Sequence, residues 1–191
     1  MNVSSFTAVY DACVLYPAPL RDLLMHLAMT DLFRAKWSDM IHDEWTSNLL
    51  KNRSDLTAQQ LAHTRNMMNA HVPDASVTDF EELIPSLKLP DPNDRHVLAA
   101  AIRGQADIIV TKNLKDFPAS VLASYGIEAQ HPDEFVVHLL DLAPEVVCEA
   151  VRLHRHSLKR PPKTVAEFLA TLELQEMPRT VEALQQFADS L

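Results

Sequence analysis

The stretch LPDPNDRHVLAAAIRGQADIIVTKNLKDFP, residues 89–118, decides the fold of this chain. Its first half predicts a helix, because Asp91 and Pro92 supply a start signal, an apolar stripe follows, and Gly104 supplies a stop. Residues 108–110 then form the run IIV, which does not alternate with polar residues and is typical of a strand buried on both faces of a parallel sheet. The stretch therefore predicts an α/β fold.

Two acids in this stretch lie at matching ends of the predicted helix and strand. Asp94 precedes Val97 by three residues, so it shares the buried face of the helix with the apolar stripe that begins there. Asp116 follows the strand, as do Thr111 and Asn113. Sites in open parallel sheets form beyond the carboxyl ends of the strands. We therefore expect Asp94 and Asp116 to share one site.

The whole chain predicts one domain with an added helical segment. Its 191 residues are 47% apolar, which is enough for a proper core. Strand and helix patterns alternate over residues 1–131, and only helical patterns follow over residues 132–191. No apolar run is long enough to span a bilayer and the first residues do not resemble a secretory signal, so we expect a cytoplasmic protein without membrane contact.

Composition also excludes several classes of function. Cys13 and Cys148 are far apart and lack the spacing of zinc ligands, and no pair of histidines has the HExxH spacing of zinc hydrolases. The two glycines cannot build a phosphate loop or a dinucleotide fingerprint, which removes most nucleotide-dependent enzymes. The formal charge of −9 argues against nucleic-acid binding over a broad surface, so any such contact must be local.

Two further acids can join the pair in the deciding stretch. Asp11 follows a short apolar strand candidate at residues 6–10, where the chain turns. Glu44 lies on a helix for which Ser38 is the expected N-cap, and it borders the buried edge of that helix beside Trp45. The residues that could meet are therefore Asp11, Glu44, Asp94 and Asp116.

A cluster of four carboxylates predicts a metal site. Two carboxylates roughly 4 Å apart repel each other by about 4 kcal/mol at an effective dielectric constant near 20, so the cluster needs cations. Hard oxygen ligands without Cys or His partners select Mg²⁺ or Mn²⁺. Such an ion lowers the pKa of an attacking water and stabilises a leaving oxygen, which is the chemistry of phosphodiester hydrolysis.

Each of these acids also has an ordinary structural interpretation. Asp91 and Asp94 could cap a helix, Asp11 could begin a turn, Asp116 could cap the short helix before Pro118, and Glu44 could be a solvated helix residue. Asp91 is better explained as the N-cap residue before Pro92 than as a member of the metal site. For Asp94, the pairing with Asp116 favours the functional interpretation.

The densest basic run of the chain is RLHRHSLKR, residues 152–160. Its cations could contact RNA phosphates or an acidic partner, or they could form a solvated helix face. The candidate RNA-binding residues are Arg152, Arg155, Lys159 and Arg160.

These residues resemble those of the PIN-domain ribonucleases. The resemblance covers residues 6–131 and rests on Asp11 after the first strand, Glu44 in HDEW, Asp94 in PNDRHVLAAA, and VTKNLKDF at residues 110–117. It is strongest to the VapC toxins of bacterial toxin and antitoxin pairs, of which one subgroup has a helical extension. The resemblance implies a three-layer α/β/α fold around a central parallel sheet, and an endoribonuclease whose four acids bind Mg²⁺ or Mn²⁺.

The resemblance also implies supporting residues and partners. Thr111 and Asn113 match polar positions that support the fourth acid. The implied partners are an RNA substrate, a cognate antitoxin protein and a second copy of the chain in a homodimer. One position departs from the pattern, because the family often has Asn or Ser two residues after the first Asp, where this chain has Cys13.

Two other classes of function stay open. A PIN fold with a degraded site would bind RNA or a protein without cleavage, and Cys13 permits this. An aspartyl-phosphate phosphatase or a receiver-like domain also begins with Asp at a strand end. The phosphatase would have Asp at position 13 and the receiver would have an acid beside Asp11, so Cys13 argues against the phosphatase.

Overall fold

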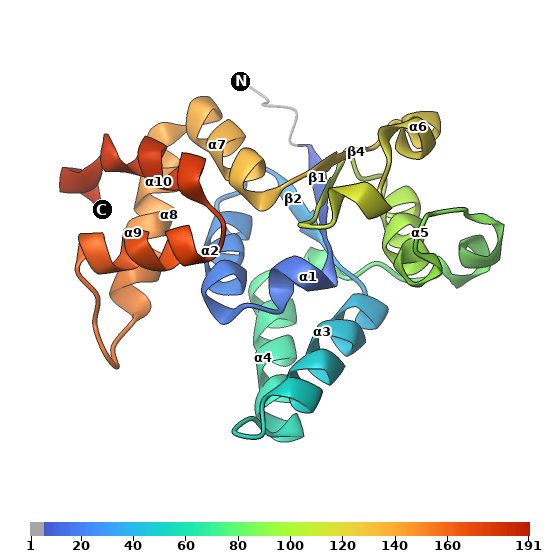
Figure 1. The fold of residues 1–191 in the computed structure, drawn as a ribbon, viewed down its shortest axis with the longest axis horizontal. Coiled ribbons are helices and arrows are strands. Elements are labelled where there is room, and N and C mark those ends of the chain that lie inside the picture. The colour runs from blue at the N-terminus through green and yellow to red at the C-terminus, as the bar shows by residue number, and fades with distance from the viewer. Residues whose placement is uncertain (1–5) are drawn as a thin grey trace. The chain divides into compact units, whose positions relative to one another are not determined.

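The computed structural model describes residues 6–191 (Figure 1). The described chain forms two compact units. The first unit contains residues 6–16 and 33–131, and the second contains residues 17–32 and 132–191. The deciding stretch and all four predicted acids belong to the first unit.

A parallel sheet forms the centre of the first unit, as predicted. Its strands are β1 (Thr7–Tyr10), β2 (Arg34–Lys36), β3 (Ile108–Val110) and β4 (Glu128–Gln130). They lie in the order β2-β1-β3-β4, and each neighbouring pair is parallel. The sequence analysis did not predict β2, because this strand is three residues long and only Ala35 in it is buried.

The pairing of β1 with β3 brings together two chain segments that are far apart in sequence. Tyr10 pairs with Val110, and the Asp11 amide then donates to the Val110 carbonyl at 3.1 Å. The Thr111 amide donates in turn to the Gln130 carbonyl at 3.0 Å. Asp11 and Thr111 therefore leave the sheet side by side at its carboxyl edge.

Helices and short 3₁₀ turns flank this sheet. The α-helices of the first unit are α1 (Ala12–Leu15), α3 (Asp39–Asn52), α4 (Ala58–His71), α5 (Arg95–Arg103) and α6 (Ala119–Leu122). α5 packs against both β1 and β3. With the family match reported below, this arrangement confirms the predicted α/β fold class.

α5 begins later than the sequence predicts. Pro92–Asp94 forms a 3₁₀ turn, and the α-helix starts at Arg95. Gly104 ends the helix as predicted, but its φ of −77° is open to any residue. Glycine is needed there for space, because a Cβ atom would lie 3.0 Å from the carbonyl oxygen of Ala100 and 3.1 Å from Cγ2 of Val77.

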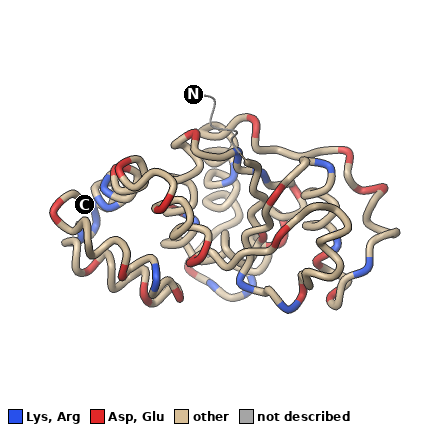
Figure 2. The backbone as a smooth tube through the Cα atoms, turned by 90° about the horizontal axis from the view of Figure 1, so that it is seen from above, with Lys and Arg blue, Asp and Glu red and all other residues tan. Residues whose placement is uncertain are grey.

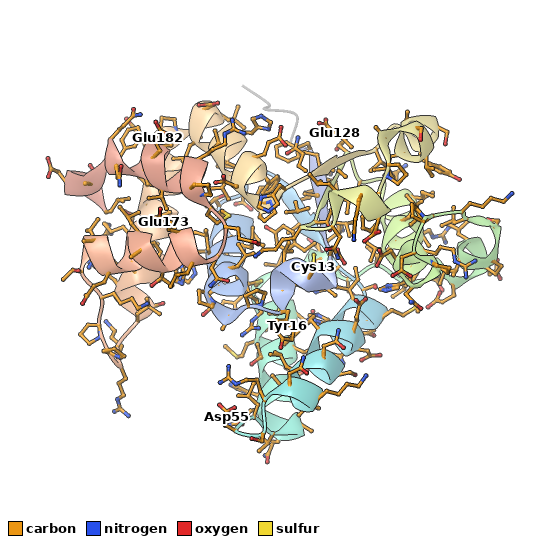
Figure 3. All side chains as sticks on the ribbon, in the orientation of Figure 1. Cys13, Tyr16, Asp55, Glu128, Glu173 and Glu182 are labelled. Carbon is orange, nitrogen blue, oxygen red and sulfur yellow. The ribbon has the colours of Figure 1, made fainter. Side chains whose placement is uncertain are left out.

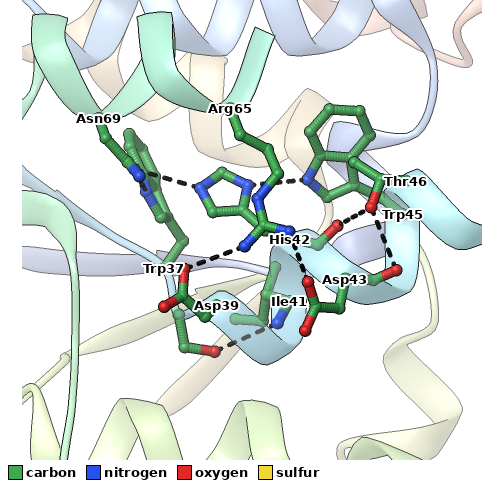
Figure 4. A network of polar contacts seen from close by, with 10 residues as sticks. Trp37, Asp39, Ile41, His42, Asp43, Trp45, Thr46, Arg65 and Asn69 are labelled. Carbon is green, nitrogen blue, oxygen red and sulfur yellow. Dashed lines mark hydrogen bonds and ion pairs between the residues drawn. The ribbon is translucent and has the colours of Figure 1, made fainter. Parts of the chain in front are cut away.

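A buried polar network joins α3 to α4 (Figure 4). Trp45 Nε1 donates to His42 Nδ1 at 3.1 Å, so His42 carries its hydrogen on Nε2, which lies 3.2 Å from Asn69 Oδ1. Trp37 Nε1 donates to the same oxygen at 2.8 Å. The predicted N-cap of α3 is also present, since Ser38 Oγ accepts from the Ile41 amide at 3.2 Å. α3 is therefore fixed at its first turns.

The second unit consists of helices. They are α2 (Ala18–Ala28), α7 (Pro132–Leu142), α8 (Pro144–Ser157), α9 (Val165–Leu174) and α10 (Pro178–Gln185). The expected division at residue 131 assigned residues 17–32 to the first domain. The contacts instead group these residues with the extension, because α2 packs against α8 and its leucine stripe, which begins at Leu20, is fully buried.

A carboxylate ties the two ends of the extension together. Asp133 lies in the first turn of α7, and it accepts from the Thr180 amide at 2.7 Å and the Arg179 amide at 3.1 Å. These amides lie at the start of α10, where backbone donors have no partner within the helix. Asp133 thus caps α10. Among the helices of residues 6–191, none has the length and apolar character to cross a membrane.

Candidate metal centre

A hollow of about 760 Å³ in the first unit contains three of the four predicted acids. Five carboxylates line it together with Lys51 and His96. The acids are Asp43, Glu44, Asp91, Asp94 and Asp116. This concentration is local, because Asp and Glu are otherwise interspersed with Lys and Arg along the chain (Figure 2).

The fourth predicted acid, Asp11, is buried and hydrogen-bonded at the carboxyl edge of the sheet. Asp11 is 2% exposed. Its Oδ2 accepts hydrogen bonds from Thr111 Oγ1 at 2.7 Å and from Cys13 Sγ at 3.0 Å. Burial raises the pKa of the Asp11 carboxyl and the charge of Glu44 adds to this rise, whereas both hydrogen bonds oppose it. The carboxylate is therefore held in one orientation.

Cys13, the position that departs from the family pattern, contacts this carboxylate directly. The residue lies on α1 (Figure 3), and its Sγ also accepts from the Lys112 amide at 3.2 Å. Burial and the charge of Asp11 raise the pKa of the thiol, so it stays protonated and can donate. The thiol therefore supplies a hydrogen bond that a small polar side chain would otherwise supply.

The contacts of Thr111 and Asn113 differ from those that the resemblance implied. Thr111 supports the first acid, Asp11, through its hydroxyl. The Asn113 amide donates to Thr111 Oγ1 at 3.0 Å, and the Asn113 carbonyl accepts from the Asp116 amide at 2.9 Å. Asn113 thus supports the turn that carries the fourth acid through its backbone.

Asp94 is the acid with the least compensated charge. It is 8% exposed, and its carboxylate has no hydrogen-bond partner within residues 6–191. The pKa of this carboxyl is raised to about 7, and burial is the largest cause. The charges of four acids add to the rise, and these are Asp11, Asp91, Glu44 and Asp116. The other three predicted acids therefore all act electrostatically on Asp94.

Glu44 contacts a residue that sequence analysis missed. Its Oε2 lies 2.9 Å from Nε2 of His96, which is on α5. The available signal was a polar residue inside the buried run HVLAAA, two positions after Asp94. A histidine in such a run needs a polar partner, but no sequence pattern indicates that α3 supplies it.

Comparison with known proteins decides the family of the chain. A model of the PIN domain matches residues 7–115, which is more than half of the sequence. This chain belongs to the PIN-domain family. A second family model, described as the VapC50 C-terminal domain, matches residues 132–186. The predicted resemblance to PIN-domain proteins with a C-terminal extension is therefore confirmed.

One curated relative matches part of this PIN-domain chain. It comes from Mycobacterium tuberculosis (strain ATCC 25618 / H37Rv) and is named "Putative ribonuclease VapC50". The two chains are 58% identical over 52 residues, a segment that covers 27% of this chain and 31% of the relative. The match thus spans less than one third of the relative's length. No solved structure matches the chain.

The donor set of this PIN domain suits a hard divalent cation. It consists of carboxylate oxygens, and the raised pKa of Asp94 marks negative charge that a cation would offset. Within the described residues, no three His, Cys, Asp or Glu side chains come close enough together to hold an ion directly. Mg²⁺ keeps several waters and needs one or two protein carboxylates, so this spacing suits an ion held partly through water.

Two of the four basic candidates make contacts within the second unit. Arg152 forms two hydrogen bonds of 2.7 Å with Glu149. Arg155 donates to the carbonyls of Lys163 and Leu191, each at 2.9 Å, and so fixes the end of the chain. Lys159 and Arg160 are exposed and follow the end of α8 at Ser157.

Proposed function

We propose that this PIN-domain chain is an endoribonuclease that depends on Mg²⁺ or Mn²⁺. The observation that carries the proposal is the environment of Asp94, a largely buried residue whose carboxylate lines the hollow without a partner in the described chain, and whose pKa four neighbouring acids help to raise. A structural acid would have a donor or a cation beside it. An acid without either fits a site that is completed by a divalent ion.

Asp11, Glu44, Asp94 and Asp116 would hold the ion, in part through water molecules bound to it. When bound, the ion would supply a water of lowered pKa and stabilise charge on the leaving oxygen. The protein contributes orientation, because Thr111 and Cys13 hold the Asp11 carboxylate by two hydrogen bonds. Lys51, which lines the hollow, can contact a phosphate beside the cleaved bond.

The substrate and the partners belong to the same proposal. RNA is supported by the name of the curated relative, which includes the word ribonuclease, and by the matching VapC50 C-terminal domain. The resemblance to VapC toxins supports inhibition by a cognate antitoxin, pairing of two copies, and action in the cytoplasm on cellular RNA.

The test is cleavage of a fluorescent single-stranded RNA by the purified protein. We expect cleavage with Mg²⁺ or Mn²⁺ and none with EDTA. Asp94→Asn and Asp11→Asn should each lower the rate at least 100-fold. Asp55→Asn is the control, because Asp55 is exposed, pairs with Arg53 and does not line the hollow. Cleavage that persists in EDTA would refute the proposal.

A second function is favoured by one observation. No three metal-binding side chains meet closely within the described residues, which fits a PIN fold that binds RNA or a protein without cleavage. Calorimetric titration with Mn²⁺ separates the two functions. Binding by the wild-type protein supports the nuclease, and absence of binding supports the inactive module.

A further inference from the structure

The contact between His96 and Glu44 links α3, which carries Glu44, to α5, which directly follows Asp94. We propose that His96 is a positioning residue, which holds the Glu44 carboxylate in place for a divalent ion. The inference rests on the proposed function, because it concerns the same site. It adds a residue of this chain to the machinery that the four acids form.

Asp94 directly precedes α5, and His96 is the second residue of that helix. The His96 side chain is 9% exposed, so the helix and its surroundings fix the ring. Its Nε2 points across to α3 and lies 2.9 Å from Glu44 Oε2. The two contacting side chains are 52 positions apart in sequence, so the contact is tertiary and not a consequence of local helix geometry.

The surroundings of the ring decide which nitrogen carries the hydrogen. Nδ1 of His96 is buried and has no partner within residues 6–191. A hydrogen on that nitrogen would be a buried donor without an acceptor, which is costly. A hydrogen on Nε2 instead points at a carboxylate oxygen. Nε2 is therefore assigned as the nitrogen that carries the hydrogen and donates to Glu44.

Glu44 has more side-chain freedom than Asp11 or Asp116. Its side chain is 37% exposed and rotates about three bonds, whereas Asp11 is buried and receives two hydrogen bonds. Asp116 is carried by a 3₁₀ turn whose backbone is bonded to Asn113. His96 is the hydrogen-bond partner that the described chain offers to the Glu44 side chain.

The helix beneath Glu44 is itself fixed. Ser38 caps α3, and the His42 network joins this helix to α4 (Figure 4). A fixed backbone at Glu44 and a fixed donor on α5 restrict the carboxylate to a small region of the hollow. Outer hydrogen bonds of this kind orient metal ligands, and their loss typically costs about 10- to 100-fold in metal affinity.

Two substitutions test this role with opposite expectations. The amide nitrogen of Gln can occupy the place of histidine Nε2, whereas the shorter Asn reaches only the place of Nδ1. Mn²⁺ affinity of the full chain, measured by titration calorimetry at fixed pH, should fall about 10-fold or more in His96→Asn. It should stay within about 3-fold of the wild-type value in His96→Gln, because the donor is restored. Circular dichroism melting shows that each variant is folded.

A double substitution separates positioning from general disturbance of the fold. In a Glu44→Ala background, His96→Asn should cause no further loss of Mn²⁺ affinity, because the carboxylate that His96 holds is gone. Equal affinity of wild type and His96→Asn would overturn the inference and leave the proposed function intact. A further loss in the Glu44→Ala background would also overturn it. Failure of the wild-type protein to bind Mn²⁺ would refute the proposed function, and the inference with it.

Discussion

Thr111 Oγ1 donates a 2.7 Å hydrogen bond to Oδ2 of Asp11, a residue 100 positions earlier in the sequence. The bond exists because β1 and β3 pair in parallel, so their carboxyl ends release both residues at one edge of the sheet. Asp11 can therefore be held in place by a residue from the most specific part of the PIN-like sequence, and this relationship leads to the first prediction.

Thr111→Val should remove this hydrogen bond while keeping the shape of the side chain. Thr111 is fully buried, and the loss leaves Asp11 with one donor fewer. We expect the free energy of unfolding to fall by about 1 to 2 kcal/mol and RNA cleavage to fall about 10-fold. Urea unfolding and cleavage assays measure both. Thr111→Ser keeps the hydroxyl and should stay close to wild type, and equal losses in both variants would contradict the account.

Cys13 should be replaceable by serine but not by alanine. The serine hydroxyl can donate to Asp11 and accept from the Lys112 amide, as the thiol does, whereas alanine can do neither. We expect Cys13→Ser to cleave RNA at the wild-type rate or faster, and Cys13→Ala to be about 3- to 10-fold slower. If alanine were fully active, the thiol would have no part in orienting Asp11.

The pKa of Asp94 predicts a pH-dependent loss of stability in the metal-free protein. It is about 7 in the folded chain, against 3.8 as the ordinary value, so the folded state holds its proton more tightly. The tighter proton binding therefore stabilises the fold fully below pH 4. This contribution to the free energy of unfolding should be lost as the pH rises through about 7.

Asp94→Asn removes this decline. With EDTA present, the variant should be about 1 to 3 kcal/mol more stable than wild type at pH 8 and equal to it at pH 3.5. Urea unfolding at the two pH values measures the difference. A variant that is less stable than wild type at pH 8 would show that the carboxylate is structural.

His154 predicts a second pH effect, in the second unit. Burial is the main cause that lowers the pKa of this imidazole from 6.5 to about 3, and the ring stacks on His26 at 4.9 Å and on Phe168 edge-to-face at 5.0 Å. As the pH falls, His154 of the unfolded chain is protonated at a higher pH than His154 of the folded chain. The free energy of unfolding is therefore highest above pH 6.5 and decreases as the pH falls toward 3.

His154→Gln should flatten this acid dependence, because glutamine has no proton to gain. Between pH 7 and pH 4 the wild type should lose about 2 to 4 kcal/mol more than the variant. Scanning calorimetry of the full chain across this range measures the difference. Parallel pH profiles would contradict the lowered pKa of His154.

The sequence predicted those parts of the fold that depend on local patterns. The apolar run of β3 and the helix that Gly104 ends were confirmed, and the Ser38 cap is present. β2 was missed because three residues, of which one is buried, carry too little pattern. α2 was grouped with the first domain because sequence order does not reveal that its leucines pack against α8.

Local sequence patterns likewise predicted only part of the site. Asp94 and Asp116 were placed together from the ends of their elements, and both line one hollow. The contact of His96 with Glu44 depends on how α5 meets α3, and the contact of Thr111 with Asp11 depends on strand register. Neither tertiary relationship has a local signal. The ligand roles of the four acids and the choice of Mg²⁺ or Mn²⁺ stay predictions.

Titration of the metal-free wild type and of Asp94→Asn with Mn²⁺ at pH 8 tests the central claim most directly. At this pH the Asp94 carboxyl is ionised, since its pKa is about 7. The account predicts saturable binding by the wild type and at least 10-fold weaker binding by the folded variant. Equal binding by both proteins, or none by the wild type, would contradict it.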